Sequence, residues 1–243
     1  RNVIPFNFTY AFSKKGFSFG ITPLRLSINQ AIIDPDFLST LDNSGQFYTS
    51  QLLTNNIVAG PKATIHWNNK TNNNSSYWQV KSNALELSGN LASLYFDLFT
   101  NKTGKNREIL GVKYSQYARS DIDVSHTFIW DENNSFAYRL NTGIGLPYGN
   151  TAFLPFERRF FVGGGNSLRA WRPRTIGPGG YRDSSNAITI EKTGEVLLQG
   201  SVEYRFDIID KLIDGAVFID AGNIWNYSKD DNFPDGEFKF NRF

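Results

Sequence analysis

Residues 153–182 read FLPFERRFFVGGGNSLRAWRPRTIGPGGYR. This glycine-rich and arginine-rich segment differs in pattern from the sequence on both sides of it. Its glycines, at 163–165, 177, 179 and 180, are typical of backbone conformations that other residues rarely adopt, so we predict a loop of defined shape. The segment lies in a connection of about fifty residues, and loops that long are usually functional or disordered. Disorder is disfavoured because aromatic residues on both sides of the glycines supply too much apolar surface for a solvated tether.

Strand-like alternation flanks this loop on both sides. After it, apolar residues at 196, 198, 202, 204 and 206 alternate with polar ones such as Glu203 and Arg205. The same period of two occurs at 3–12, 17–28, 57–67, from 78, at 122–130, at 136–144 and around 217–221, which predicts an all-β chain. Within 17–28 the apolar residues change parity after Pro23, so we predict a β-bulge there that restores one apolar face.

The connections between these segments alternate in length. They are short at 13–16, 68–76, 131–134 and 207–213, and long at 29–55, 90–111 and 146–194. Outer-membrane barrels place short turns in the periplasm and long loops outside, whereas a soluble all-β sandwich, the alternative, has no reason to sort its loops. The pattern therefore predicts a transmembrane antiparallel β-barrel. A transmembrane helix is not predicted, because no run of about twenty apolar residues exists.

The run from Pro155 to Tyr181 resembles the sixth extracellular loop of the outer-membrane assembly-factor superfamily, the BamA/TamA-type surface-antigen barrels. The centre of that loop reads roughly Val-Arg-Gly-aromatic in the family, and Leu168-Arg169-Ala170-Trp171 stands there in this chain. Ala170 in place of the glycine resembles the TamA-like (TamL) branch of Bacteroidetes. Two further family elements are FIDAGNIW at 218–225 and GEFKFNRF at 236–243, so the resemblance is strong over the C-terminal third and rests on pattern elsewhere.

The resemblance implies a barrel of sixteen strands in the bacterial outer membrane, preceded by periplasmic domains. Nine strands are recognisable here, the last beginning near residue 236. We name residues 146–194 the signature loop. If this loop joins strands eleven and twelve, as in the family, then residues 1–243 are an internal part of one C-terminal barrel domain, from about strand six to strand fourteen.

The resemblance also implies a site. Arg169 matches the family's loop arginine, which docks on acidic residues of the barrel wall, and the matching wall positions are Glu203 and Asp220, with Phe218 alongside. Charge is costly on the lipid face, so these carboxylates are expected to face the lumen. There a guanidinium can pair with a carboxylate through two parallel hydrogen bonds, the two-pronged geometry. The alternative is that Arg169 bonds carbonyls of its own loop. The predicted site comprises Gly164, Gly165, Leu168, Arg169, Trp171, Glu203, Phe218 and Asp220.

Several functional classes are disfavoured by composition and motifs. With 25 basic and 23 acidic residues the net charge is +2, which is too small to indicate binding of nucleic acid. The glycines at 163–165 precede no Lys-Ser/Thr pair, so a phosphate loop is disfavoured. No serine and histidine are marked as a catalytic pair, His126 lies on the lipid-facing parity, and the absence of cysteine excludes thiol chemistry. We therefore expect no enzymatic activity, no metal and no cofactor.

The function that the resemblance implies is a translocation and assembly factor of the outer membrane. Such a protein helps to insert outer-membrane proteins, or moves envelope components together with a TamB-like periplasmic partner. The expected partners are outer-membrane lipid, nascent outer-membrane proteins and that TamB-like protein, with no nucleic acid. The alternatives are a two-partner polypeptide secretion pore, which shares the signature loop, and a passive diffusion porin.

Overall fold

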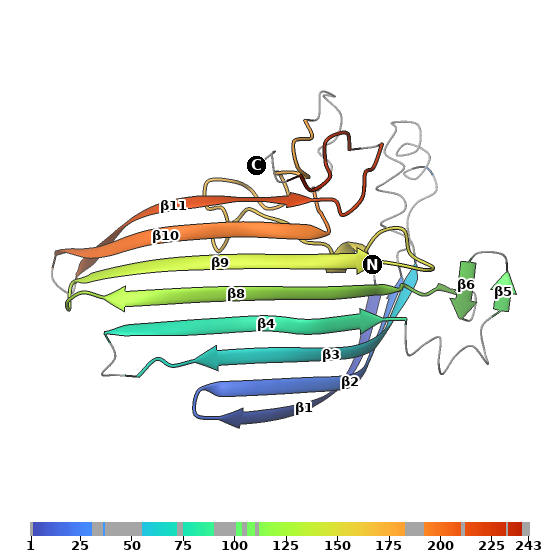
Figure 1. Ribbon diagram of the computed structural model, residues 1–243, viewed down its shortest axis with the longest axis horizontal. Helices are drawn as coiled ribbons and strands as arrows, with labels where there is room; N and C mark the ends of the chain where they lie inside the picture. The colour runs from blue at the N-terminus through green and yellow to red at the C-terminus, as the bar shows by residue number, and fades with distance from the viewer. Residues whose placement is uncertain are drawn as a thin grey trace.

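A computed structural model describes residues 2–30, 36, 55–71, 75–89, 101–103, 106–109, 112–182, 192–209, 212–231 and 233–239. Eight long strands form one antiparallel sheet in the order β1-β2-β3-β4-β8-β9-β10-β11 (Figure 1). They are β1 (Asn2–Lys14), β2 (Phe17–Gln30), β3 (Asn56–Asn68), β4 (Ser76–Ser88), β8 (Tyr117–Ile129), β9 (Asn134–Pro147), β10 (Val196–Ile209) and β11 (Ile213–Trp225). The predicted all-β antiparallel architecture is confirmed.

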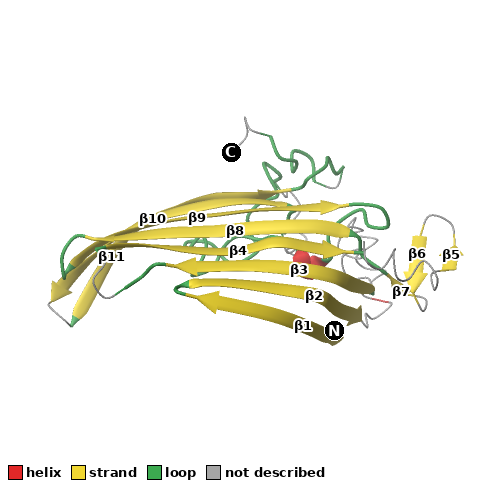
Figure 2. Ribbon diagram, turned by 60° about the horizontal axis from the view of Figure 1, so that its bottom comes forward, coloured by secondary structure: helices red, strands yellow, loops and turns green. Residues whose placement is uncertain are grey.

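Each long strand pairs with the next long strand along the chain, and the sheet is curved (Figure 2). Because the strands have 13 or 14 residues, each exceeds the roughly 9–11 residues that a tilted strand needs to cross a bilayer. Within the part of the chain that the structure describes, no helix is long and apolar enough to span a membrane.

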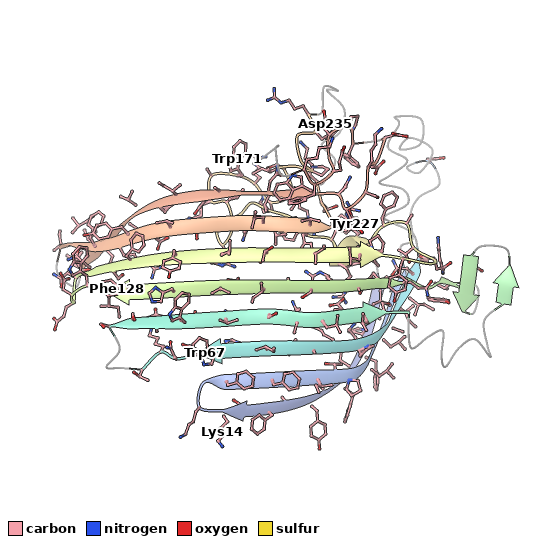
Figure 3. The ribbon with its side chains drawn as sticks, viewed as in Figure 1. Lys14, Trp67, Phe128, Trp171, Tyr227 and Asp235 are labelled. Carbon is pink, nitrogen blue, oxygen red and sulfur yellow. The ribbon has the colours of Figure 1, made fainter. Side chains whose placement is uncertain are left out.

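The short and long connections leave opposite ends of the sheet. Figure 3 shows Lys14 at the end where the short turns lie, and Tyr227 and Asp235 at the other end. The turn between β1 and β2 consists of Lys15 and Gly16, whose φ angles of 44° and 78° are those of the two-residue turn that suits the twist of a hairpin. The alternation of connection lengths in the sequence therefore corresponds to two physically distinct ends.

The two faces of the sheet differ in polarity. We call the face that carries the signature loop the inner face and the opposite one the outer face. The outer face exposes a band of large apolar side chains, including Phe6, Phe8, Tyr10, Phe12, Leu24, Ile122, Phe128, Tyr138, Leu140, Ile144, Val202, Val217 and Ile219. His126 lies in this band, with its ring centroid 4.3 Å from that of Trp78 and 5.1 Å from that of Tyr138. Such aromatic belts are typical of the interfacial region of barrels.

Bulges in β2 and β4 change the direction of side chains. In β2 the register shifts between Thr22 and Arg25, which confirms the bulge predicted around Pro23. A second bulge, which the sequence analysis did not predict, lies in β4 between Asn83 and Glu86. After each bulge an apolar residue faces outward and a charged residue faces inward, because an extra residue reverses the alternation.

Two segments differ from the prediction. Part of the connection at 90–111, expected to be irregular, forms β5 (Asn101–Thr103) and β6 (Asn106–Ile109), which make a second small sheet with β7 (Val112–Lys113) just after it. These strands are too short to show an apolar period of two. The described part of the expected ninth strand, residues 236–239, lies outside the large sheet and meets the end of β11 through one parallel bridge between Asn226 and Glu237; residues 240–243 fall outside the described residues.

Candidate functional site: a loop docked on the inner face

The described part of the signature loop that follows β9, residues 148–182 and 192–194, packs on the inner face of the sheet. The buried apolar residues Phe160, Val162 and Leu168 of the loop form one cluster with Leu197 of β10 and Ile224 of β11. Glycines make room for the loop in β9. A Cβ atom at Gly143 would lie 2.5 Å from Phe160 Cζ, and one at Gly145 would lie 2.5 Å from Leu154 Cδ2. The core of this part of the molecule is therefore formed between loop and wall.

Backbone hydrogen bonds shape the tip of the loop, residues 163–172. The Arg174 amide donates to Val162 O at 3.0 Å and the Gly164 amide donates to Trp171 O at 2.9 Å, which closes the tip on itself. Gly163 and Gly164 have φ angles of 101° and 96°, a region that favours glycine. The Ser167 hydroxyl donates to Gln199 Oε1 at 2.6 Å and so ties the tip to β10.

Arg169 projects from this tip onto two carboxylates of neighbouring strands. Its Nε donates to Asp220 Oδ2 at 2.8 Å and its Nη2 donates to Asp220 Oδ1 at 2.7 Å, which is the two-pronged geometry. Its Nη1 donates to Glu203 Oε2, and its backbone amide donates to Asp220 Oδ2 at 3.1 Å. We call Arg169, Glu203 and Asp220 the Arg169 anchor.

The Arg169 anchor is partly shielded from water. The side chains of Arg169, Glu203 and Asp220 are 24%, 16% and 7% exposed. Phe218 lies beneath the guanidinium, whose Cζ is 3.4 Å from the ring centroid. The hydrogen bonds with Asp220 raise the pKa of Arg169 above its usual range, so the guanidinium remains charged. Arg205 also donates to Glu203, so this carboxylate is shared by two cations.

The other predicted site residues take different positions. Leu168 is buried in the cluster beside Arg169, and Gly164 has the positive φ that explains its glycine. Trp171 is 58% exposed and contributes its carbonyl to the closure of the tip. For Gly165 the structure gives no reason for glycine, because a Cβ atom there would have no neighbour within 4 Å. The expectation that the glycines at 163–165, 177, 179 and 180 are all required by the backbone is therefore corrected: Gly163, Gly164, Gly177 and Gly179 have positive φ, whereas Gly165 and Gly180 do not.

Arg139 of β9 also contacts the loop from the inner face. Its guanidinium pairs with Asp123 of β8, with Nε 2.8 Å from Asp123 Oδ1, and its Nη1 donates to Asn166 O at 2.7 Å. A polar space remains between the tip and strands β4, β8, β9 and β10, lined by side chains that include Gln79, Ser125 and Arg205.

Sequence reasoning missed a second charged group on the inner face. Glu86 of β4 is 1% exposed and lies 2.9 Å from Arg25 of β2 and 3.5 Å from Arg158 of the signature loop. The sequence contains a pattern that could have predicted this position of Glu86. The outward-facing apolar residues of β4 are even-numbered at Trp78 and Val80 but odd-numbered at Leu85. That change marks a bulge, as the equivalent change in β2 does.

Comparisons with known proteins agree with this architecture. The profile of the Omp85 superfamily domain matches residues 67–242. The outer membrane protein assembly factor BamA of Neisseria meningitidis serogroup B is 28% identical over 139 residues, which cover 54% of this chain and 17% of that protein. The crystal structure of BamA from Haemophilus ducreyi lacking POTRA domains 1–3 matches with a TM-score of 0.58 and 15% identity, over 93% of this chain and 42% of that one. The chain thus spans less than half the length of these relatives, and the structural likeness confirms the predicted β-barrel fold.

Proposed function

Because the chain belongs to the Omp85 superfamily and forms part of an outer-membrane β-barrel, we propose that its protein inserts or assembles nascent outer-membrane proteins and that the signature loop, docked by Arg169, is required for this work. The apolar band of the outer face then contacts outer-membrane lipid, because an uncharged surface is what the hydrocarbon region accepts. The carboxylates of the inner face are kept away from that lipid and are available to the loop.

The observation that carries the proposal is the pairing of one loop arginine with two strands. Asp220 of β11 and Glu203 of β10 both bind Arg169, so the position of the tip depends on the arrangement of these two strands. A barrel that rearranges its wall while handling a client would change this pairing, and a loop held by charge-assisted bonds in partly shielded surroundings can respond to that change.

The experiment is replacement of Arg169 in the full-length protein, expressed as the only copy in its own host. In Arg169→Ala we expect normal amounts of barrel in the outer membrane, because the strand ladder is intact, but a reduced level of correctly folded client proteins. Arg169→Lys should rescue only partly, since an ammonium lacks the planar fork. Each 1.4 kcal/mol of lost docking free energy lowers the ratio of docked to undocked loop about tenfold.

Arg172→Ala is the matched control, because Arg172 is an exposed arginine of the same tip. Normal client assembly in Arg169→Ala would contradict the proposal. A selective loss of one secreted polypeptide, with outer-membrane proteins unaffected, would favour the secretion pore instead. The finer proposal of a TamB-like partner, supported by the resemblance of Leu168–Trp171 to the TamA-like branch, predicts that such a periplasmic protein co-purifies with the full-length barrel.

A further inference from the structure

Glu86 is the centre of a buried charge network on strands that do not contribute to the Arg169 anchor. Its Oε1 accepts a hydrogen bond of 2.7 Å from the Tyr117 hydroxyl of β8 and lies 2.9 Å from Arg25 Nη1. Arg158 Nε lies 3.5 Å from the same oxygen. A carboxylate that is 1% exposed is costly to bury unless it is both paired and hydrogen-bonded, so Glu86 depends on these partners.

The two β-bulges are what bring this network together. In the first part of β2 the odd-numbered apolar residues face outward, and in the first part of β4 the even-numbered ones do. Continued without interruption, these patterns would point Arg25 and Glu86 outward, where charge is unfavourable. The register shifts at Thr22/Arg25 and Asn83/Glu86 turn both side chains inward. Strands β2 and β4 both flank β3, and a bulge in each strand places one residue of the Arg25–Glu86 ion pair on the inner face.

The loop supplies one member of the network. Arg25, Lys62 and Arg119 come from strands, and both Lys62 and Arg119 are cross-strand neighbours of Glu86. Arg158 comes from the 3-10 turn η1 (Phe156–Arg158) of the signature loop. The contact between Arg158 and Glu86 therefore joins the beginning of the loop to the wall, in addition to the contact that Arg169 makes near its tip.

Apolar contacts strengthen the same junction. Leu154 is fully buried in a cluster with Val58 and Tyr117, so the ring of Tyr117 packs on the loop while its hydroxyl binds Glu86. Phe160 packs over Gly143, and the Arg119 guanidinium lies over its ring with Cζ 4.2 Å from the centroid. We call residues 153–160 the base of the loop.

The tip begins with Gly163 and Gly164, both of which have positive φ, so these two glycines lie between the base and Arg169. We propose that Glu86 is a positioning residue that anchors the base of the signature loop to the wall through Arg158, independently of the Arg169 anchor at the tip. The consequence for assembly rests on the proposed function, whereas the anchoring itself does not. A loop that is fastened both at its base and near its tip, with glycines between these contacts, can release its tip while its base stays in place.

Hydrogen–deuterium exchange of the full-length protein in detergent tests this proposal. In Arg158→Gln, amides of residues 153–160 should lose at least about tenfold protection while those of 163–172 stay unchanged. Arg169→Ala should give the reverse pattern. Arg158→Lys should retain most of the protection at the base, because the contact with Glu86 is a single ion pair rather than a two-pronged one. Glu86→Gln should give the same loss of protection at residues 153–160 as Arg158→Gln. If Glu86→Gln does not fold, the exchange pattern of Arg158→Gln alone tests the anchor.

Arg172→Gln is the control, because it removes an exposed arginine of the same loop and should leave both segments protected. Unchanged protection of 153–160 in Arg158→Gln would overturn the Glu86 anchor. Equal loosening of base and tip in either single variant would overturn their independence. Since no client is present, the outcome does not depend on assembly activity, and a failure of the proposed function would leave these exchange patterns unaffected.

Discussion

Arg169 illustrates how one side chain can hold the tip of a loop against a barrel wall, beside the apolar cluster to which Leu168 belongs. Its guanidinium uses Nε and both terminal nitrogens on two carboxylates and lies on the ring of Phe218. Lysine has neither the fork nor the flat face that these contacts require. Breaking such a pair by removing one partner costs roughly 3–5 kcal/mol when the pair is fully buried, and less here because water reaches the arginine.

A charge exchange tests this residue-level account. Arg169→Glu and Asp220→Arg should each expose residues 163–172 to protease, because each places like charges together. The double variant should recover part of the protection, since one opposite-charge pair is restored across the same two positions. Limited proteolysis followed by mass spectrometry of the tip gives the comparison. Additive losses in the double variant would show that the two residues do not interact.

Among the strands, β9 has one face that is apolar and exposed and another face on which the signature loop packs. Its apolar residues Tyr138, Leu140 and Ile144 are exposed on the outer face. On the inner face Arg139 binds Asn166 O, and two glycines leave the space that Phe160 and Leu154 occupy. Glycine weakens a strand because it lacks a side chain to pack, so glycines in this position are explained by the close approach of the loop.

Filling one of these spaces should displace the base of the loop. In Gly143→Val, the new side chain meets the ring of Phe160, and overpacking of this kind typically costs about 1–3 kcal/mol. We expect faster amide exchange in residues 153–162 with the barrel intact. Gly200→Val is the matched control, because its Cβ would make an ordinary contact of 3.6 Å with Arg139 O. Equal exchange in both variants would show that the loop does not depend on the space at 143.

The whole molecule is polarised along the strands and across the sheet. The tight turns at Lys15–Gly16 and 131–133 lie at one end, and the residues that follow β11 lie at the other (Figures 1 and 3). Across the sheet, apolar side chains cover the outer face, while ion pairs and the signature loop cover the inner face. This arrangement suits a barrel wall with lipid on one side and an occupied lumen on the other.

Single cysteines can establish the orientation, because residues 1–243 contain none. With an impermeant maleimide, Lys229→Cys should be labelled on intact cells, because the end with long connections faces outward in such barrels. Asn133→Cys should be labelled only after the outer membrane is permeabilised. Both positions are exposed, so permeabilised cells serve as the control for reactivity. The reverse pattern would contradict the assigned orientation.

Local patterns in the sequence predicted the eight long strands, the two kinds of connection between them and the inner and outer faces. These features depend on neighbouring residues along the chain, where a period of two and the length of a gap can be read directly. The predicted Arg169 partners Glu203 and Asp220 came from the family resemblance, and alternation alone placed both on the polar face.

The side-chain contacts across strands follow from the folded arrangement and could not be predicted from local patterns. Arg25, Glu86, Tyr117 and Arg158 lie far apart in sequence, and their meeting depends on strand register and on two bulges. A shift of one residue in either strand would turn its charge to the other face, and no local pattern fixes the pairing partner. The positions of Trp171 and Gly165 were likewise set by how the tip closes on itself, which depends on contacts within the folded loop rather than on the motif.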